Sequence, residues 1–479
     1  MILYILNHPY HYEMENLCRC FCPTASLRVI HGFSSGRISI RPYRLRVVSH
    51  DMTVITRIST HITVQLRQGR RRLTLTRSLG ENNELTMAQM LFTLLRRATG
   101  CTPPWGLLTG VRPSKLMLRL RRDEGETAAE RYFRDTLWVS EEKTRLATTI
   151  AKAEEPMIAL TKPRSFSLYI SIPFCPSRCS YCSFVSHTIN RASAQKLIPS
   201  YVDALCKEIV FTGEIARNLG LELTSVYIGG GTPTSLTSQQ LYTLCETLHA
   251  NFSIAGEFTV EAGRVDTITA EKLRVLREHG VNRISVNPQS MDDRVLQLAG
   301  RQHSAQDVLD AYELVRAHDF ACVNMDLIAG LPGDKPAGFT QSLAQVCALK
   351  PENITVHVLA IKRAARLEQL PTSDFLYTMP SEYAPYYMYR QSRSLGNLEN
   401  IGWTLPGHAC RYNVDMMEES HTILACGAGG VTKLKHPHTD ELERVFGLKY
   451  PYEYLRRFDE LMQRKARVME FYGALGKIF

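Results

Sequence analysis

The chain has 479 residues, 44% apolar and 22% charged, with thirteen scattered cysteines, a composition that excludes a disordered chain and the disulfide framework of a small secreted protein. No run of about 18 apolar residues is present, so we expect no transmembrane helix, no membrane partner and a cytoplasmic location. The net charge of +10 fits nucleic acid, an anionic surface or a polyanionic small substrate, and by itself selects none of them.

The N-terminal segment begins with an apolar run, Met1–Leu6, which predicts a first β-strand. Cys18, Cys20 and Cys22 follow, each separated from the next by one larger residue. This alternation favours a strand with small residues along one face, and a second metal site is the less favoured interpretation.

Residues 1–165 together predict a separate α+β domain, because short alternating segments rich in arginine precede a helical pattern. Val64–Leu66 and Leu73–Leu75 can pair as a hairpin, whose turn carries Gly69 and the run Arg70–Arg72. The helical pattern extends over Thr86–Arg97. We interpret the arginine run as a solvated turn, with contact to RNA as the weaker alternative.

Residues 166–360 show strands that alternate with helices. Helix starts are indicated by capping residues at Thr237, Thr269 and Ser304. Because parallel strands need crossover connections, this alternation predicts an α/β fold, a partial (β/α)6 TIM-like barrel with its chemistry at the C-terminal ends of the strands. The six expected strands are Leu168–Ile172, Thr224–Ile228, Glu257–Glu261, Arg283–Val286, Cys322–Leu327 and Ile354–Val358.

Residues 361–479 predict an irregular C-terminal segment that covers the mouth of the barrel. It carries a tyrosine-rich stretch, a glycine-rich stretch over Cys426–Gly430 and a helical tail over Tyr452–Phe471. The chain is thus expected to have three parts, with the boundaries 1–165, 166–360 and 361–479.

Three cysteines follow the first strand of the barrel on one short loop. Cys175, Cys179 and Cys182 are separated by three and then two residues. Three thiolates on such a loop can hold three irons of a cubane cluster and leave the fourth iron open to a chelating cofactor. A structural zinc site is the weaker interpretation, because it needs a fourth ligand and none stands at zinc-finger spacing. The spacing therefore predicts a [4Fe–4S] cluster.

The segment Tyr169–Cys182 resembles the cluster loop of the radical S-adenosylmethionine (SAM) superfamily, and most of all that of oxygen-independent coproporphyrinogen III oxidases and their relatives. The resemblance implies that the amino and carboxylate groups of SAM chelate the unique iron. It also implies that an electron from the cluster splits the sulfonium and yields a 5′-deoxyadenosyl radical.

The resemblance continues through the later strands. The segment Gly229–Thr234 resembles the glycine motif whose backbone approaches the methionyl end of SAM. Arg301 matches an arginine that pairs with the SAM carboxylate, and Asp326 matches a position that contacts a ribose or a second cofactor. Taken together, the resemblance implies cofactor contacts for Tyr169, Tyr181, Gly230, Gly231, Thr232, Glu261, Gln289, Arg301, Asp326, Ala360 and Val431.

Two positions depart from the decarboxylating enzymes of this family. Those enzymes carry another cysteine two residues after the third ligand, where this chain has Phe184, and a histidine where this chain has Ser171. The chain is most similar to the HemZ-type branch, which shares a long N-terminal domain and segments like Trp105–Leu116 and Tyr386–Asn397. With these segments, the resemblance covers nearly the whole chain.

The resemblance implies oxidative decarboxylation of coproporphyrinogen III to protoporphyrinogen IX. The adenosyl radical would take a hydrogen atom from the propionate β-carbon, and loss of CO2 and one electron would leave a vinyl group. A tetracarboxylate substrate suits a basic chain, and Arg363 and Arg366 are candidate partners for its carboxylates. The implied partners are this tetrapyrrole and a cytosolic one-electron donor.

Two alternatives to the decarboxylase stay open. The first is a haem chaperone that keeps the radical SAM barrel without decarboxylase activity, which the Phe184 departure allows. The second is a radical SAM enzyme that acts on RNA, suggested by the arginine-rich N-terminal domain, although nucleic acid is the less expected partner.

Overall fold

The structure is a computed structural model that describes residues 1–23, 25–32, 52–184, 186–189, 192–360 and 375–476. The chain forms two compact units. One comprises Met1–Thr148 with Arg390–Glu399, and the other comprises Thr149–Tyr389 with Asn400–Phe479. No helix in the described ranges is long and apolar enough to cross a membrane. The expected three-part division at residues 165 and 360 stays a prediction.

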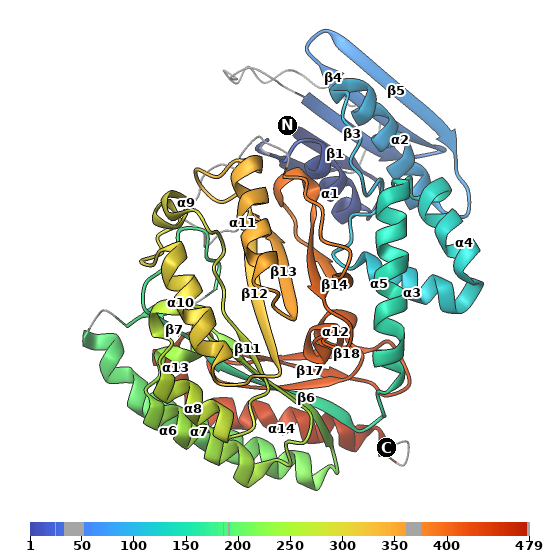
Figure 1. The fold of residues 1–479 in the computed structure, drawn as a ribbon. Coiled ribbons are helices and arrows are strands. Elements are labelled where there is room, and N and C mark those ends of the chain that lie inside the picture. The colour runs from blue at the N-terminus through green and yellow to red at the C-terminus, as the bar shows by residue number, and fades with distance from the viewer. Residues whose placement is uncertain (24, 33–51, 185, 190–191, 361–374, 477–479) are drawn as a thin grey trace. The chain divides into compact units, whose positions relative to one another are not determined.

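The first unit contains a five-stranded sheet in the order β2-β1-β3-β4-β5 (Figure 1). The strand β1 is parallel to both β2 and β3, whereas β4 is antiparallel to both β3 and β5. The expected hairpin is formed by β4 and β5, with Val64 opposite Leu75 and Gly69 at a φ of 58° in the turn. The strands are β1 (Ile2–Leu6), β2 (Arg28–Gly32), β3 (Met52–Ile58), β4 (His61–Gln68) and β5 (Arg71–Ser78).

The expected strand at Cys18–Cys22 is wrong, because this segment belongs to a helix. Its buried residues are Met14, Leu17, Cys18 and Phe21, which follow the helical period of three and four. In the sequence, the cysteines repeat every second residue, as in a strand, and this repeat obscures the helical period. The helices of this unit are α1 (His11–Phe21), α2 (Asn83–Thr99), α3 (Pro113–Glu124), α4 (Glu126–Arg131), a π-helix (Tyr132–Thr136) and the first part of α5 (Glu141–Ala159).

The second unit is organised around an eleven-stranded sheet in the order β14-β15-β13-β12-β11-β10-β9-β6-β16-β17-β18. Its central strands β6, β9, β10, β11, β12 and β13 are the six that the sequence predicts, and each is parallel to its neighbours among them. This confirms the partial barrel. Their bounds are β6 (Ser165–Ile172), β9 (Glu222–Gly230), β10 (Glu257–Glu261), β11 (Arg283–Ser285), β12 (Cys322–Ala329) and β13 (Asn353–Val358).

The C-terminal segment is more regular than expected, since it adds five strands to the sheet. The strand β16 runs parallel to β6 as a seventh parallel strand. All five residues of β16 are buried, so it lacks the alternation of polar and apolar residues that marks a half-exposed strand. The added strands are β14 (Ala384–Arg390), β15 (Glu399–Thr404), β16 (Thr422–Cys426), β17 (Val431–Lys435) and β18 (Leu442–Phe446).

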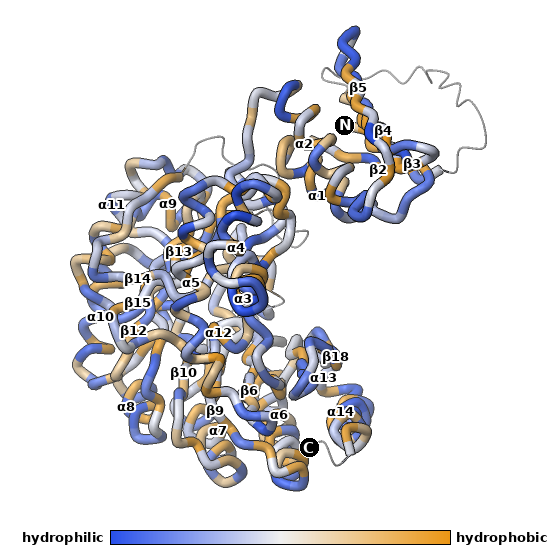
Figure 2. Tube along the Cα trace, turned by 90° about the vertical axis from the view of Figure 1, so that its right-hand side faces the viewer, coloured by the Kyte–Doolittle hydropathy of each residue, from blue (hydrophilic) through white to orange (hydrophobic). Residues whose placement is uncertain are grey.

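Helices cover the outer face of the curved sheet, as Figure 1 shows for α6, α7, α8 and α10. Thr237, Thr269 and Ser304 cap α7, α8 and α10 as expected, and Thr237 and Ser304 form capping boxes. Hydrophobic and hydrophilic residues alternate along α7 and α14 in Figure 2, as is typical of helices with one buried face. The helices are α6 (Ala192–Asn218), α7 (Ser238–Asn251), α8 (Ala270–Glu278), α9 (Asp293–Leu298), α10 (Ala305–Arg316), α11 (Pro336–Ala348), α12 (Arg411–Glu418), α13 (Pro451–Arg456) and α14 (Phe458–Ala474).

Candidate cofactor site

The cysteine loop starts where β6 ends. Cys175 lies in the short strand β7 (Phe174–Cys175), which pairs with β8 (His187–Thr188). Cys179 and Cys182 lie in a turn in which the Cys182 amide donates to the Cys179 carbonyl at 3.2 Å. All three thiols are free, and burial raises the pKa values of Cys175 and Cys182. The metal-free thiols of Cys175 and Cys182 are therefore protonated, and metal binding at these two residues would release protons.

The three thiols fit a cluster better than a single ion. Among the described residues, no three histidine, cysteine or carboxylate side chains converge on one position that could hold a metal ion. A zinc ion needs its ligands around one point, whereas each thiolate of a cubane binds its own iron. The chemistry of this donor set therefore fits a [4Fe–4S] cluster.

The glycine segment at the end of β9 is packed against the strand that leads to Cys175. The Gly231 amide donates to the Ile172 carbonyl at 2.8 Å, and the Thr232 amide donates to the Phe174 carbonyl at 2.7 Å. A Cβ atom on Gly231 would lie 2.6 Å from the Phe174 carbonyl oxygen. Packing within the protein thus requires a glycine here, independently of the approach to SAM that the motif implies.

Glu261 ends β10 beside this glycine segment. Its Oε1 accepts a hydrogen bond from the Tyr227 hydroxyl at 2.6 Å, and a Cβ atom on Gly229 would lie 3.1 Å from its Oε2. The two arginines that could form a structural pair with Glu261 bind other carboxylates, Arg264 that of Asp266 at 2.8 Å and Arg283 that of Glu257 at 3.5 Å. In the described part of the chain, no cation lies within ion-pair distance of Glu261. The carboxylate therefore has no ion-pair partner among these residues.

Asp326 on β12 makes polar contacts with side chains of β12 and β13. Its Oδ1 accepts from Asn324 Nδ2 at 2.8 Å, and its Oδ2 lies 3.6 Å from His357 Nε2. The other ring nitrogen of His357, Nδ1, lies 3.2 Å from the Tyr389 hydroxyl. Sequence reasoning missed His357, whose signal is a titratable residue near the C-terminal end of the parallel strand β13.

Arg301 connects the cysteine loop with the ends of two strands. Its Nε donates to the Tyr181 hydroxyl at 3.1 Å, and its Nη1 donates to the carbonyls of Gly263 and Asn287 at 3.2 and 2.8 Å. Only Nη2 has no hydrogen-bond partner among the described residues. The expected pairing with a ligand carboxylate is thus limited to this nitrogen.

The remaining expected residues lie at the same strand ends. Gln289, just after β11, has a φ of 69°, which is unusual for a residue with a side chain. Ala360 follows β13 and is buried, and Val431 begins β17. Arg363 and Arg366 lie outside the described residues.

The two positions that differ from decarboxylating relatives have distinct surroundings. Phe184 is 64% exposed, two residues beyond the third cysteine of the loop. Ser171 is buried, and its hydroxyl donates to the Ala428 carbonyl at 2.7 Å.

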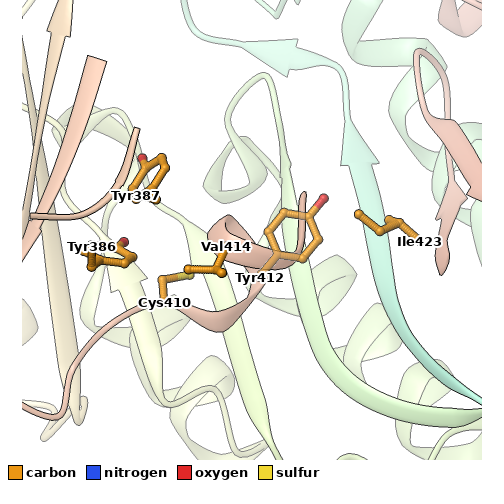
Figure 3. Close-up of a cluster of buried hydrophobic side chains, with 6 residues drawn as sticks. All are labelled: Tyr386, Tyr387, Cys410, Tyr412, Val414 and Ile423. Atoms are coloured by element: carbon orange, nitrogen blue, oxygen red, sulfur yellow. The ribbon is translucent and has the colours of Figure 1, made fainter. Parts of the chain in front are cut away.

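Three tyrosine rings stack on the inner face of the sheet. Tyr412 on α12 lies 4.4 Å from the ring centroid of Tyr227 and 6.2 Å from that of Tyr169, with interplanar angles of 20° and 16°. Figure 3 shows Tyr412 within its buried cluster, between Tyr386 and Tyr387 of β14 and Ile423 of β16. The Tyr412 hydroxyl is buried without a hydrogen-bond partner in the described structure. Sequence reasoning missed Tyr412, because no local pattern connects it with Tyr169.

Comparisons with known proteins agree with this geometry. Residues 169–345 match the model of the radical SAM superfamily, whose members use a [4Fe–4S] cluster and SAM. The chain is 36% identical over 407 residues to the oxygen-independent coproporphyrinogen-III oxidase-like protein HemZ of Bacillus subtilis, with 80% of this chain and 81% of that protein covered. It is 35% identical over 219 residues to the haem chaperone HemW of the same organism, with 45% and 56% covered.

Among solved structures, the coproporphyrinogen III oxidase HemN of Escherichia coli matches with a TM-score of 0.49 and 22% identity, covering 65% of this chain and 73% of that one. The share of the HemZ sequence that is covered, together with the superfamily match, settles the family. The chain belongs to the radical SAM superfamily, among the oxygen-independent coproporphyrinogen-III oxidase-like proteins.

Proposed function

We propose that this chain oxidatively decarboxylates coproporphyrinogen III to protoporphyrinogen IX. One observation carries the proposal: three free thiols, a glycine segment and an unpaired Glu261 lie at the ends of neighbouring parallel strands in a chain of this family. When bound, the cluster and SAM supply a 5′-deoxyadenosyl radical that abstracts hydrogen, which is the difficult part of the chemistry. The net charge of +10 suits a substrate with four carboxylates.

The chain's own residues would bind and orient these groups. Cys175, Cys179 and Cys182 would hold the cluster, and Glu261 would accept hydrogen bonds from the SAM ammonium. Arg301 would offer Nη2 to the SAM carboxylate while its other nitrogens hold Tyr181 in place. A cytosolic one-electron donor would reduce the cluster, which agrees with an expected cytoplasmic location.

Turnover under anaerobic conditions tests this proposal. Reconstituted protein is incubated with coproporphyrinogen III, SAM and a chemical reductant, and the products are identified by mass spectrometry. We expect the masses of products that have lost CO2 together with two hydrogens, first once and then twice, and no such products with Cys179→Ala. Intact substrate in the presence of a protein that holds the cluster and binds SAM would contradict the decarboxylase proposal.

A haem chaperone is the second candidate. Its support is the similarity to the haem chaperone HemW, together with Phe184 in place of the cysteine of decarboxylating relatives. The same protein is tested for stoichiometric haem retention after gel filtration. Haem retention without CO2 loss from coproporphyrinogen would favour the chaperone over the enzyme.

A further inference from the structure

The C-terminal helix contributes one half of a buried ion pair. Lys465 Nζ on α14 lies 3.0 Å from Glu208 Oε1 on α6, and their side chains are only 7% and 2% exposed. Removing two charges from water carries a desolvation penalty that mutual attraction repays only when further hydrogen bonds satisfy both groups. The partners of this pair therefore indicate what it holds in place.

Glu208 binds the backbone of the glycine-rich loop, defined here as Cys426–Gly430, and Lys465 binds the backbone of the residue just before it. The Gly427 amide donates to Glu208 Oε2 at 2.7 Å, and Lys465 Nζ donates to the Ala425 carbonyl just before the loop at 2.8 Å. The Tyr454 hydroxyl of α13 also donates to Glu208 Oε2, at 2.6 Å. The ion pair thus fixes the point where β16 enters the glycine-rich loop.

A second set of contacts fixes the same loop to the end of β6. The Tyr201 hydroxyl donates to the Ser171 carbonyl and accepts from the Ala428 amide, both at 2.8 Å. The Ser171 hydroxyl donates to the Ala428 carbonyl at 2.7 Å. A Cβ atom on Gly427 would lie 2.5 Å from the Ser171 carbonyl oxygen, so the loop and β6 are in direct contact. Four residues beyond Ser171 along the chain is Cys175.

The glycine-rich loop needs such anchors because its backbone is permissive. Gly427 and Gly429 have φ values of 95° and 81°, and glycine populates many other conformations in the absence of restraint. Val431, an implied contact of SAM, directly follows the loop. When only a fraction of molecules has a competent binding site, the apparent affinity for the ligand falls by that fraction.

We propose that Glu208 and Lys465 are positioning residues that set the affinity for SAM by holding the glycine-rich loop against the end of β6. This inference rests on the proposed SAM contact at Val431. Their contacts are with the backbone of Gly427 and Ala425, and both residues act through that backbone. The C-terminal helix α14 is thereby a functional part of the cofactor site.

Lys465→Met tests the inference, because it removes the ammonium and keeps an unbranched side chain that is one atom shorter. SAM affinity is measured by equilibrium dialysis on cluster-loaded protein, and iron content and thermal unfolding are measured beside it. We expect an unchanged iron content and a dissociation constant for SAM that rises about tenfold. A rise of this size would result if the loop had the conformation that binds SAM in roughly one molecule in ten. Tyr201→Phe, which deletes one oxygen, is a milder second variant and should shift the dissociation constant in the same direction.

A matched control is available in the other unit, where Lys143 Nζ lies 2.7 Å from Glu399 Oε1 with side chains 9% and 4% exposed. Lys143→Met should lower the melting temperature to a similar extent and leave the dissociation constant unchanged. An unchanged SAM affinity in Lys465→Met and Tyr201→Phe, or an equal loss in Lys143→Met, would overturn the inference alone. Absence of SAM binding to the wild-type protein would overturn the proposed function and, with it, this inference.

Discussion

The hydroxyl of Tyr227 donates a 2.6 Å hydrogen bond to Oε1 of Glu261, and in the described structure no cationic side chain lies within ion-pair distance of this carboxylate. Burial raises the pKa of Glu261 to about 7, although the hydrogen bond from Tyr227 acts in the opposite direction. An enclosed carboxylate of this kind gains from a cationic partner. The SAM ammonium is such a partner.

Glu261→Gln should therefore weaken SAM binding without weakening the fold. The substitution keeps the shape and an acceptor for Tyr227 but loses the charge. Loss of one partner of an enclosed charge pair costs about 2 kcal/mol or more, which corresponds to a roughly thirtyfold loss of affinity. In thermal unfolding, we expect a nearly unchanged midpoint without SAM and the loss of most of the SAM-induced shift. A lower midpoint without SAM together with a full SAM-induced shift would show that Glu261 is structural.

The raised pKa of Glu261 also predicts a pH dependence. Between pH values of about 4.5 and about 7, Glu261 binds more protons in the folded chain than in the unfolded chain. Its contribution to stability is therefore present at low pH and falls as the pH rises. The ionised form binds an ammonium, so SAM affinity should rise as the pH increases through about 7. Equilibrium dialysis across this pH range should show that SAM affinity changes with pH in the wild type and changes less in Glu261→Gln. Identical profiles would contradict the assignment.

The cysteine loop gives a direct test of the cluster. Anaerobically reconstituted protein should hold about four irons and four sulfides per chain, bound by three thiolates. Cys179→Ala should abolish the brown chromophore, because two thiolates cannot hold the cubane. Cys245→Ala, at a buried cysteine outside this loop on α7, is the control and should keep the full iron content. A full cluster in Cys179→Ala would refute the ligand assignment.

The repeating part of the barrel could be predicted from the sequence, because its signals are local. Each of the strands β9, β10, β11 and β12 is followed by a helix, and side chains such as Thr237 and Ser304 satisfy the first amides of those helices. Fully buried β16 could not be predicted, because it has no polar face to mark its period. The helix α1 was concealed by the regular spacing of Cys18, Cys20 and Cys22.

Some residues of the candidate site could likewise be predicted from the sequence, and others could not. The sequence spacing of the three cluster cysteines identifies them as candidate ligands, because ligands from one loop must lie close in sequence. These residues are Cys175, Cys179 and Cys182. The stack of Tyr169 with Tyr412 joins residues from distant parts of the chain, and only the fold brings them together. The same holds for Lys465 and Glu208, each of which resembles an ordinary helical surface residue until α14 packs on α6.

Arg301 and Tyr181 provide the last prediction. Arg301 uses Nε for Tyr181 and Nη1 for the Gly263 and Asn287 carbonyls, so Arg301→Lys loses several directed contacts while it keeps the charge. We expect SAM affinity to fall at least tenfold while the iron content stays at the wild-type level. Tyr181→Phe removes only the hydroxyl that accepts from Nε and leaves Nη2 available, so its loss of affinity should be smaller. Equal SAM affinity in the wild type and Arg301→Lys would show that Arg301 organises the cysteine loop and has no direct part in SAM binding.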